Sequence, residues 1–259
     1  MANYADYSKE YAECYELITQ HKSYINEVDA LIAFLDAFQF DKKILSVGCG
    51  TGTHERYLAK NGFKVFGIDK SKWMINHALS ASKGIPNLSF GLTFHDGEQY
   101  LAPPPLNCVI SLFNVVNCLA GSSSLRKFFK EVFARMDSGG VFFFEAWNGM
   151  ECMINPPKDV FRDFKDLHGN YLNRKARPYL NTSKQHLQIE YEISGCMQGR
   201  SVAMKSVHNI RLFTVNEIIH HLSSVGFKCV HVYSSLPSLE PFDFDSPSPP
   251  RMLAFSALI

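Results

Sequence analysis

The segment KKILSVGCGTGTHERYLAKNGFKVFGIDKS, residues 42–71, constrains the fold more than any other part of the chain. A short apolar run leads into glycines at alternate positions, Gly48, Gly50 and Gly52, and a helical pattern then leads into a second apolar run that ends at Asp69. Glycine lets a backbone turn sharply and approach a ligand closely, because it has no Cβ. Such a turn after a buried strand opens onto the crevice where open α/β sheets bind ligands. The segment therefore predicts a strand, a turn, a helix and a strand, with a ligand site at the turn.

Strand and helix patterns alternate along most of the chain. Two helical patterns come first, within residues 8–38 and separated by the polar residues 19–23, and apolar runs then alternate with helices as far as Trp147. This alternation predicts a parallel sheet with helices on both faces. The segment SSSLRKFFKEVFARMDSGG predicts a helix with serine caps and a glycine stop, followed by the buried strand VFFFEAW.

The pattern changes to a period of two between residues 160 and 213. Stretches such as HLQIEYEIS and AMKSVHNIRLF predict an antiparallel insert at this point. One more helix, TVNEIIHHLSSVGF, and two strands, KCVHVYSS and RMLAFSALI, complete the chain. The sequence thus predicts an α/β fold that carries a separate antiparallel element.

The composition limits the ligands and the compartment. The 259 residues carry 26 Lys and Arg against 25 Asp and Glu, a formal net charge of +1. This balance gives no electrostatic footprint for nucleic acid or an anionic membrane. The seven cysteines include no C-x-x-C pair, and the polar start of the chain shows no leader segment. We therefore expect a cytoplasmic protein without a disulfide framework or a bound metal.

The spacing of the glycines separates two classes of ligand. Dinucleotide-binding turns have the pattern G-x-G-x-x-G, whereas this chain has G-x-G-x-G with Thr53 in the next position. The shorter spacing suits a ligand that lies across the turn without a pyrophosphate. Asp69 could accept hydrogen bonds from both hydroxyls of a ribose, because a carboxylate only accepts. Dinucleotide enzymes use an acid in the same way, so Asp69 does not discriminate by itself.

Five motifs, in order, resemble those of the class I S-adenosylmethionine-dependent methyltransferases. They are ILSVGCGTG, the acid Asp69, FHDG, SLFNVVNCL and MDSGGVFFFEAWN, and together they cover about residues 42–148. The Tyr-rich start, SLFNVVN and the insert are most similar to small-molecule methyltransferases, a group that includes amino-sugar N-methyltransferases. The resemblance implies a Rossmann-like, doubly wound, seven-stranded and mostly parallel sheet with an antiparallel β insert, and S-adenosyl-L-methionine as the cofactor.

The same resemblance implies a division of the chain into four parts. Residues 1–40 would form an N-terminal helical lid, and residues 41–149 the core that binds S-adenosylmethionine. Residues 150–212 would form the insert that covers the substrate. Residues 213–259 would supply a helix and a β-hairpin that complete the core sheet.

The resemblance also implies which residues bind the cofactor: Ser46, Gly48, Gly50, Gly52, Asp69, Asp96, Gly97, Phe113 and Asn114. Asp96 would meet the adenine amino group, while Phe113 and Asn114 would line the methionine part. Ser46 stands where the family usually has Asp or Glu, and a serine accepts a hydrogen bond but brings no charge. From the residues alone, Asp96 could instead cap the turn before Gly97, and Asn114 could instead satisfy loop backbone.

Tyr15 and His208 are the candidate catalytic residues. Tyr15 belongs to a segment that resembles the family's N-terminal piece covering the cofactor. His208 lies on an alternating strand of the insert, where a substrate would be gripped and a base could act. Either could instead be structural. Aromatic residues at helical spacing usually belong to a core, and most of the 10 histidines must be surface residues or interior residues with satisfied hydrogen bonds.

The predicted function is methyl transfer from S-adenosylmethionine to a small-molecule acceptor by in-line displacement, with N-methylation favoured over O-methylation. We expect no nucleic-acid or membrane partner, and a homodimer is the assembly to test. Two alternatives stay open. A nicotinamide oxidoreductase would need a glycine at position 53 and a substrate domain, and the chain offers neither. A catalytically inactive S-adenosylmethionine-binding regulatory or scaffold protein is compatible with Ser46.

Overall fold

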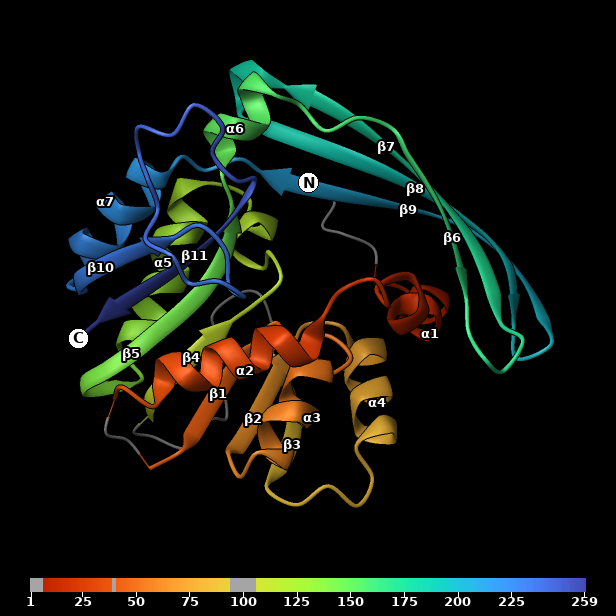
Figure 1. Cartoon of the computed structure of the whole chain (residues 1–259), viewed down its shortest axis with the longest axis horizontal. Helices are drawn as coiled ribbons and strands as arrows, with labels where there is room; N and C mark the ends of the chain where they lie inside the picture. The colour runs from red at the N-terminus through yellow and green to blue at the C-terminus, as the bar shows by residue number, and fades with distance from the viewer. Residues whose placement is uncertain (1–6, 39–40, 94–105) are drawn as a thin grey trace.

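The computed structural model describes residues 7–38, 41–93 and 106–259, so the predicted cofactor contacts of Asp96 and Gly97 lie outside the described residues. A seven-stranded sheet forms the core, in the order β10-β11-β5-β4-β1-β2-β3 (Figure 1). Its strands are β1 (Lys43–Val47), β2 (Lys64–Asp69), β3 (Leu88–Leu92), β4 (Leu106–Ser111), β5 (Met136–Trp147), β10 (Lys228–Tyr233) and β11 (Met252–Leu258). β1 to β5 pair in parallel, and β11 runs antiparallel to both of its neighbours. The predicted fold class is confirmed.

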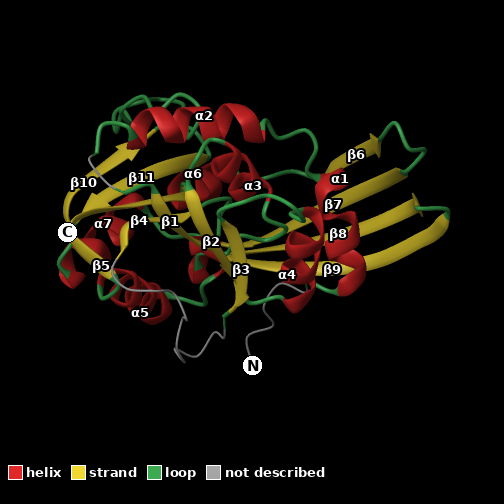
Figure 2. Cartoon of the chain, turned by 90° about the horizontal axis from the view of Figure 1, so that it is seen from below, coloured by secondary structure: helices red, strands yellow, loops and turns green. Residues whose placement is uncertain are grey.

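Helices cover both faces of this sheet (Figures 1 and 2). They are α1 (Lys9–Ile18), α2 (Tyr24–Leu35), α3 (Thr53–Lys60), α4 (Lys72–Ala81), α5 (Ser122–Phe133), α6 (Gly149–Ile154) and α7 (Val215–Val225), with short 3-10 turns at Val116–Cys118 and Thr182–Lys184. Successive strand residues point to opposite faces. In β1, Ile44 packs with α2 and α3, whereas Leu45 packs with α5 and α7. Over the described ranges, none of these helices is long and apolar enough to cross a membrane.

The predicted extent of one helix is wrong. α5 has no side-chain cap at its start and ends at Phe133, and β5 already begins at Met136. Met136 pairs with Leu106 of β4, and the Gly139 N–H donates to the Ile259 carbonyl at 3.3 Å across the sheet. The backbone of this stretch is therefore committed to neighbouring strands, which ends the helix before the glycine pair.

A second sheet, four-stranded and antiparallel, forms the predicted insert in the order β6-β7-β8-β9. Its strands are β6 (Val160–Lys165), β7 (Tyr171–Asn181), β8 (His186–Met197) and β9 (Arg200–Arg211). The insert extends away from the core sheet, and α1 lies against its inner face (Figure 1). Tyr11 and Ile18 of α1 belong to one apolar cluster with Phe164 and Leu172 of the insert and with Met74 of α4. α1 therefore joins the insert to the core.

A buried group of charges ties the connection between α1 and α2 to the core. Lys22 Nζ lies 2.9 Å from Glu27 Oε2 and 3.8 Å from Glu145 Oε2. His54 Nε2 lies 2.8 Å from the same Glu27 oxygen, and Lys22 Nζ is also 3.9 Å from the centroid of the Phe113 ring. Burial alone would raise the pKa of Glu27, but His54 and Lys22 hold it below its ordinary value. Glu27 is therefore the charged centre of this group.

Gly149, the first residue of α6, lies against the backbone that follows β9. A Cβ at this position would come within 2.4 Å of the Phe213 carbonyl oxygen. We expect Gly149→Ala to lower the free energy of unfolding by about 1–3 kcal/mol, because the core would be overpacked. Gly121→Ala at the start of α5 is the matched control, since nothing lies within 4 Å of its Cβ position. Equal free energies of unfolding in urea for the two variants would contradict this contact.

The Glu27 carboxylate should make stability depend on pH. Its pKa is depressed in the folded chain, so its contribution is complete above the unfolded pKa of about 4.3 and is lost as the pH falls through the folded value. We expect Glu27→Gln to lower the free energy of unfolding by about 1–3 kcal/mol at neutral pH. The difference from the unaltered chain should shrink below about pH 4.

Urea unfolding at several pH values measures this difference. Glu13→Gln is the control, because the Glu13 side chain is exposed and its ion pair with Lys9 is a surface pair in α1. If the free energies of unfolding of Glu27→Gln and the unaltered chain differed by the same amount at every pH, the charge of Glu27 would not stabilise the fold.

Candidate functional site

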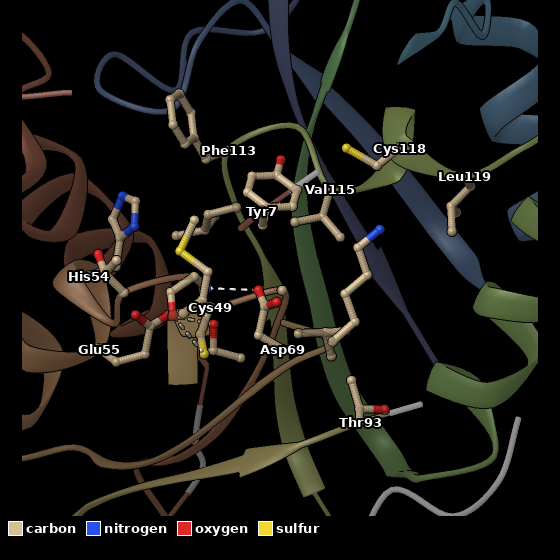
Figure 3. Close-up of a pocket in the computed structure, with 18 of the residues that line it drawn as sticks. Tyr7, Cys49, His54, Glu55, Asp69, Thr93, Phe113, Val115, Cys118 and Leu119 are labelled. Atoms are coloured by element: carbon tan, nitrogen blue, oxygen red, sulfur yellow. Dashed lines mark hydrogen bonds between the residues drawn. The ribbon is translucent and has the colours of Figure 1, made fainter. Parts of the chain in front are cut away.

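A cavity of about 270 Å³ lies at the carboxyl ends of the central strands β1, β2 and β4 (Figure 3). Its lining comes from the N-terminal segment, the glycine turn, the first turn of α3, the end of β2 and the segment after β4. Tyr15, Gly50, Glu55, Asp69 and Phe113 each represent one of these parts. Ligands of open α/β sheets bind at this edge. The cavity therefore lies where the sequence predicts a ligand site.

Backbone hydrogen bonds lock the glycine turn to the end of β2. The N–H groups of Gly48 and Cys49 both donate to the Ile68 carbonyl, at 2.7 and 3.0 Å. The Gly50 N–H donates to Asp69 Oδ2 at 3.0 Å. All three predicted glycines have a positive φ, which other residues rarely adopt. The shape of the turn is thus fixed by its neighbour strand and by residue type together.

The three glycines have different structural roles. A Cβ on Gly48 would lie 2.4 Å from Val115 of the segment after β4, and a Cβ on Gly50 would meet nothing nearer than Tyr15 at 4.0 Å. Gly48 and Gly50 line the cavity. Gly52 does not line it; Gly52 precedes α3, and its Cβ would lie 2.5 Å from Phe90 of β3. The structure therefore places two of the three glycines at the ligand site and the third in the packing behind it.

Asp69 presents a fixed carboxylate to the cavity. Its Oδ2 accepts the Gly50 N–H at 3.0 Å, and its Oδ1 accepts the Ser71 N–H at 2.8 Å. Burial raises the pKa of Asp69, and these two backbone donors act in the opposite direction. A carboxylate has about four acceptor positions, so two remain for a ligand. The geometry suits a diol, as the sequence predicts.

Ser46 is joined to a carboxylate that the sequence analysis did not single out. The Ser46 hydroxyl donates to Glu55 Oε1 at 2.6 Å, and both residues are buried and line the cavity. Glu55 shares the buried face of α3 with Leu58 and Ala59, at the spacing i, i+3 and i+4. A carboxylate on an apolar helix face was the signal that could have identified it, since such a group is buried at a cost unless it has a function or a partner.

The segment after β4 has two consecutive non-glycine residues in the left-handed region, Phe113 (φ 59°) and Asn114 (φ 70°). The Phe113 N–H donates to Glu145 Oε2 at 2.8 Å, and its side chain lines the cavity. Asn114 does not line it, and its Oδ1 accepts the Trp147 N–H at 3.3 Å. The amide of Asn114 thus faces the backbone at the end of β5, where the same Trp147 N–H also donates to Asn117 Oδ1 at 2.8 Å.

Of the two candidate catalytic residues, only Tyr15 lines the cavity, where burial raises the pKa of its phenol. His208 lies behind the lining, with its ring centroid 5.1 Å from those of Tyr7 and Tyr11 and 4.9 Å from that of Tyr191. Burial lowers the pKa of His208 to about 4, and nearby positive charges add to the effect. The imidazole is therefore neutral at neutral pH. Across residues 7–38, 41–93 and 106–259, no three His, Cys, Asp or Glu side chains gather to hold a metal ion.

Comparison with known proteins agrees with this geometry. A family model described as a methyltransferase domain matches residues 20–232, which is most of the chain. A relative from Streptomyces fradiae, named dTDP-3-amino-3,6-dideoxy-alpha-D-glucopyranose N,N-dimethyltransferase, is 26% identical over 86% of this chain and 85% of that protein. The likeness thus extends over both chains.

Two solved structures share the fold. A S-adenosylmethionine-dependent methyltransferase from Clostridium acetobutylicum superposes with a TM-score of 0.77 at 15% identity, covering 95% of this chain and 96% of that one. Streptomyces venezuelae DesVI superposes with a TM-score of 0.74 at 20% identity, covering 95% and 97%. With the family match over most of its length, this chain belongs to the methyltransferase-domain family.

Proposed function

We propose that this chain is a S-adenosylmethionine-dependent methyltransferase that N-methylates a small molecule. The observation that carries the proposal is the Asp69 carboxylate, which two backbone N–H groups hold at the cavity edge with acceptor positions left over. Those positions suit the ribose hydroxyls of an adenosyl ligand. Gly50 lacks a Cβ, so a ligand can approach the backbone of the turn beside Tyr15, which lies 4.0 Å from the Cβ position.

The names of relatives support an amine on a small sugar-like molecule as the acceptor. Besides the Streptomyces fradiae relative, a Streptomyces venezuelae relative of 25% identity is named dTDP-3-amino-3,4,6-trideoxy-alpha-D-glucopyranose N,N-dimethyltransferase. Both names specify transfer to the nitrogen of an amino sugar. We infer the same chemical class of acceptor here, with N-methylation favoured over O-methylation.

The residues of the chain would align the acceptor and exclude water, which are the main protein contributions to an in-line displacement. The bound cofactor would supply an activated methyl group on a positively charged sulfur. Tyr15 and Phe113 cover one side of the cavity, with ring centroids 6.5 Å apart. An alkyl amine must lose its proton before it can attack. An apolar aromatic wall disfavours the charged form of the amine and so assists that loss.

The expected partners follow from the same proposal. The substrate is a small molecule, with neither nucleic acid nor a membrane as a partner, and the compartment is the cytoplasm. A homodimer stays a prediction, which sedimentation of the purified chain would test.

The function is tested by incubating the purified chain with S-adenosylmethionine and a panel of acceptors. The panel holds dTDP-linked amino sugars, simple alkyl amines and phenols, and mass spectrometry follows S-adenosylhomocysteine and the methylated product. We expect one or two methyl groups to be added to an amino sugar nitrogen. Turnover of phenols alone would contradict N-methylation. Cofactor binding without turnover of any acceptor would favour the inactive regulator.

Asp69→Ala should weaken binding of S-adenosylhomocysteine by about 1–3 kcal/mol, because the ribose hydroxyls would lose a buried acceptor. Calorimetric titration measures this loss. Asp29→Ala, at an exposed position of α2, is the control and should leave the affinity unchanged. An unchanged affinity for Asp69→Ala, in a chain that still unfolds cooperatively, would remove the ribose assignment.

Tyr15 and His208 can be separated by kinetics. Tyr15→Phe should lower kcat/KM by roughly 3- to 10-fold, since it removes one hydrogen-bonding group from the cavity lining. His208→Phe keeps the aromatic packing and should change kcat/KM by less than about 3-fold, because the ring lies behind the lining. A loss of roughly 100-fold or more with His208→Phe would identify His208 as the base instead.

A further inference from the structure

One carboxylate oxygen at the cavity, Oε2 of Glu55, has no hydrogen-bond partner among the described residues. Glu55 is 2% exposed and lines the cavity from the first turn of α3. Its Oε1 accepts the Ser46 hydroxyl at 2.6 Å, whereas its Oε2 is buried and has no hydrogen-bond partner among the described residues. A buried polar oxygen without a hydrogen-bond donor destabilises the fold unless a ligand donates to it.

The basic side chains next to Glu55 in the sequence, His54 and Arg56, already pair with other groups. His54 Nε2 lies 2.8 Å from Glu27 Oε2. The guanidinium of Arg56 donates to the Thr51 carbonyl at 2.7 Å and to Glu16 Oε1 at 2.6 Å. Burial raises the pKa of Glu55, although His54 and Ser46 act against that rise. No salt bridge to Glu55 forms within the described part of the chain, and a cation in the cavity would stabilise the charged form of this carboxyl.

The position of Glu55 relative to Asp69 indicates which part of a ligand it would contact. Figure 3 shows Glu55 and Asp69 on the two sides of the glycine turn, with the bond from Gly50 to Asp69 between them. Asp69 suits the ribose, so Glu55 faces a different end of the same ligand. S-adenosylmethionine carries its amino-acid part, with one ammonium group, at the end of the molecule opposite its adenine. That ammonium is the group to which a buried carboxylate is complementary.

We propose that Glu55 supplies the carboxylate that binds the ammonium of the cofactor, so that α3 provides the charge that Ser46 at the end of β1 lacks. The assignment rests on the proposed S-adenosylmethionine dependence. Ser46 has a positioning role, because its hydroxyl occupies Oε1 and leaves Oε2 for the ligand. The acid and its orienting hydroxyl lie nine residues apart in the sequence and come together only in the fold.

The test compares two ligands that differ in the amino-acid part. Glu55→Gln should weaken binding of S-adenosylhomocysteine roughly 10- to 100-fold in calorimetric titration, the usual value of a hydrogen bond to a charged group. Binding of 5′-methylthioadenosine, which lacks the amino-acid part, should change less than about 3-fold. Glu13→Gln, with its exposed side chain, is the control and should affect neither ligand.

Two further variants test the link to position 46. Ser46→Ala removes the hydroxyl that orients Glu55 and should produce a smaller loss, again for S-adenosylhomocysteine alone. Ser46→Asp combined with Glu55→Gln returns a carboxylate to the same corner of the cavity and should restore most of the lost affinity. Thermal unfolding of the ligand-free variants shows whether each one folds; Glu55→Gln should not be less stable, because it removes a buried charge.

The outcomes distinguish this inference from the broader proposal. Equal weakening of both ligands by Glu55→Gln would show a structural role and overturn the inference. Unchanged binding of both ligands would overturn it as well, while leaving the cofactor assignment standing. If the unaltered chain bound neither ligand, the proposed dependence on S-adenosylmethionine would itself fail.

Discussion

The attachment of the glycine turn to the end of β2 is the constraint on which the site depends. One carbonyl, that of Ile68, accepts two N–H groups of the turn, and the next side chain, Asp69, accepts a third. The carboxyl ends of β1 and β2 are therefore held in one geometry without help from a ligand. Because α3 begins directly after Gly52, its first turn is aimed by the same bonds, and with it the side chains of His54 and Glu55.

A second set of contacts holds α1 and its connection to α2, which cover the cavity. Tyr15 stands over Gly50 because α1 is packed between the insert and α4. The connection from α1 to α2 is in turn held by Lys22, which reaches Glu27 and Glu145 beneath the Phe113 ring. Charge pairing and aromatic packing thus fix the covering segment from two directions. This arrangement keeps Tyr15 and Phe113 in place at the cavity.

Much of the fold could be predicted because its signals are local. The glycine spacing, the alternation of strands with helices and the period-two insert are patterns within short segments, and they predicted the sheet and the position of the cavity. The boundary between α5 and β5 was missed because it depends on pairing with distant strands, through Met136 and Gly139. Strand register is a tertiary property and leaves little trace in a local pattern.

The candidate site, like the fold, could be predicted only in part. Asp69 follows from its place at the end of an apolar run, but Gly52 serves packing because Phe90, far along the chain, fills the space behind it. Asn114 and Asn117 both accept from the Trp147 N–H, a partner that sequence spacing does not reveal. Glu55 carried a local signal, a charge on the apolar face of a helix. Its partner Ser46 became visible only once β1 and α3 were placed together.

The insert and the core have separate hydrogen-bonded sheets, and no strand is shared between them. Leu187, Ile189 and Ile210 of the insert pack in a cluster distinct from those that hold the seven-stranded sheet. Substitutions at these three positions can therefore accumulate with little effect on the core sheet, whereas substitutions at Phe164 and Leu172 would disturb the packing of α1. In evolutionary terms, this architecture would let the core sheet keep its chemistry while the insert changes to suit a different acceptor.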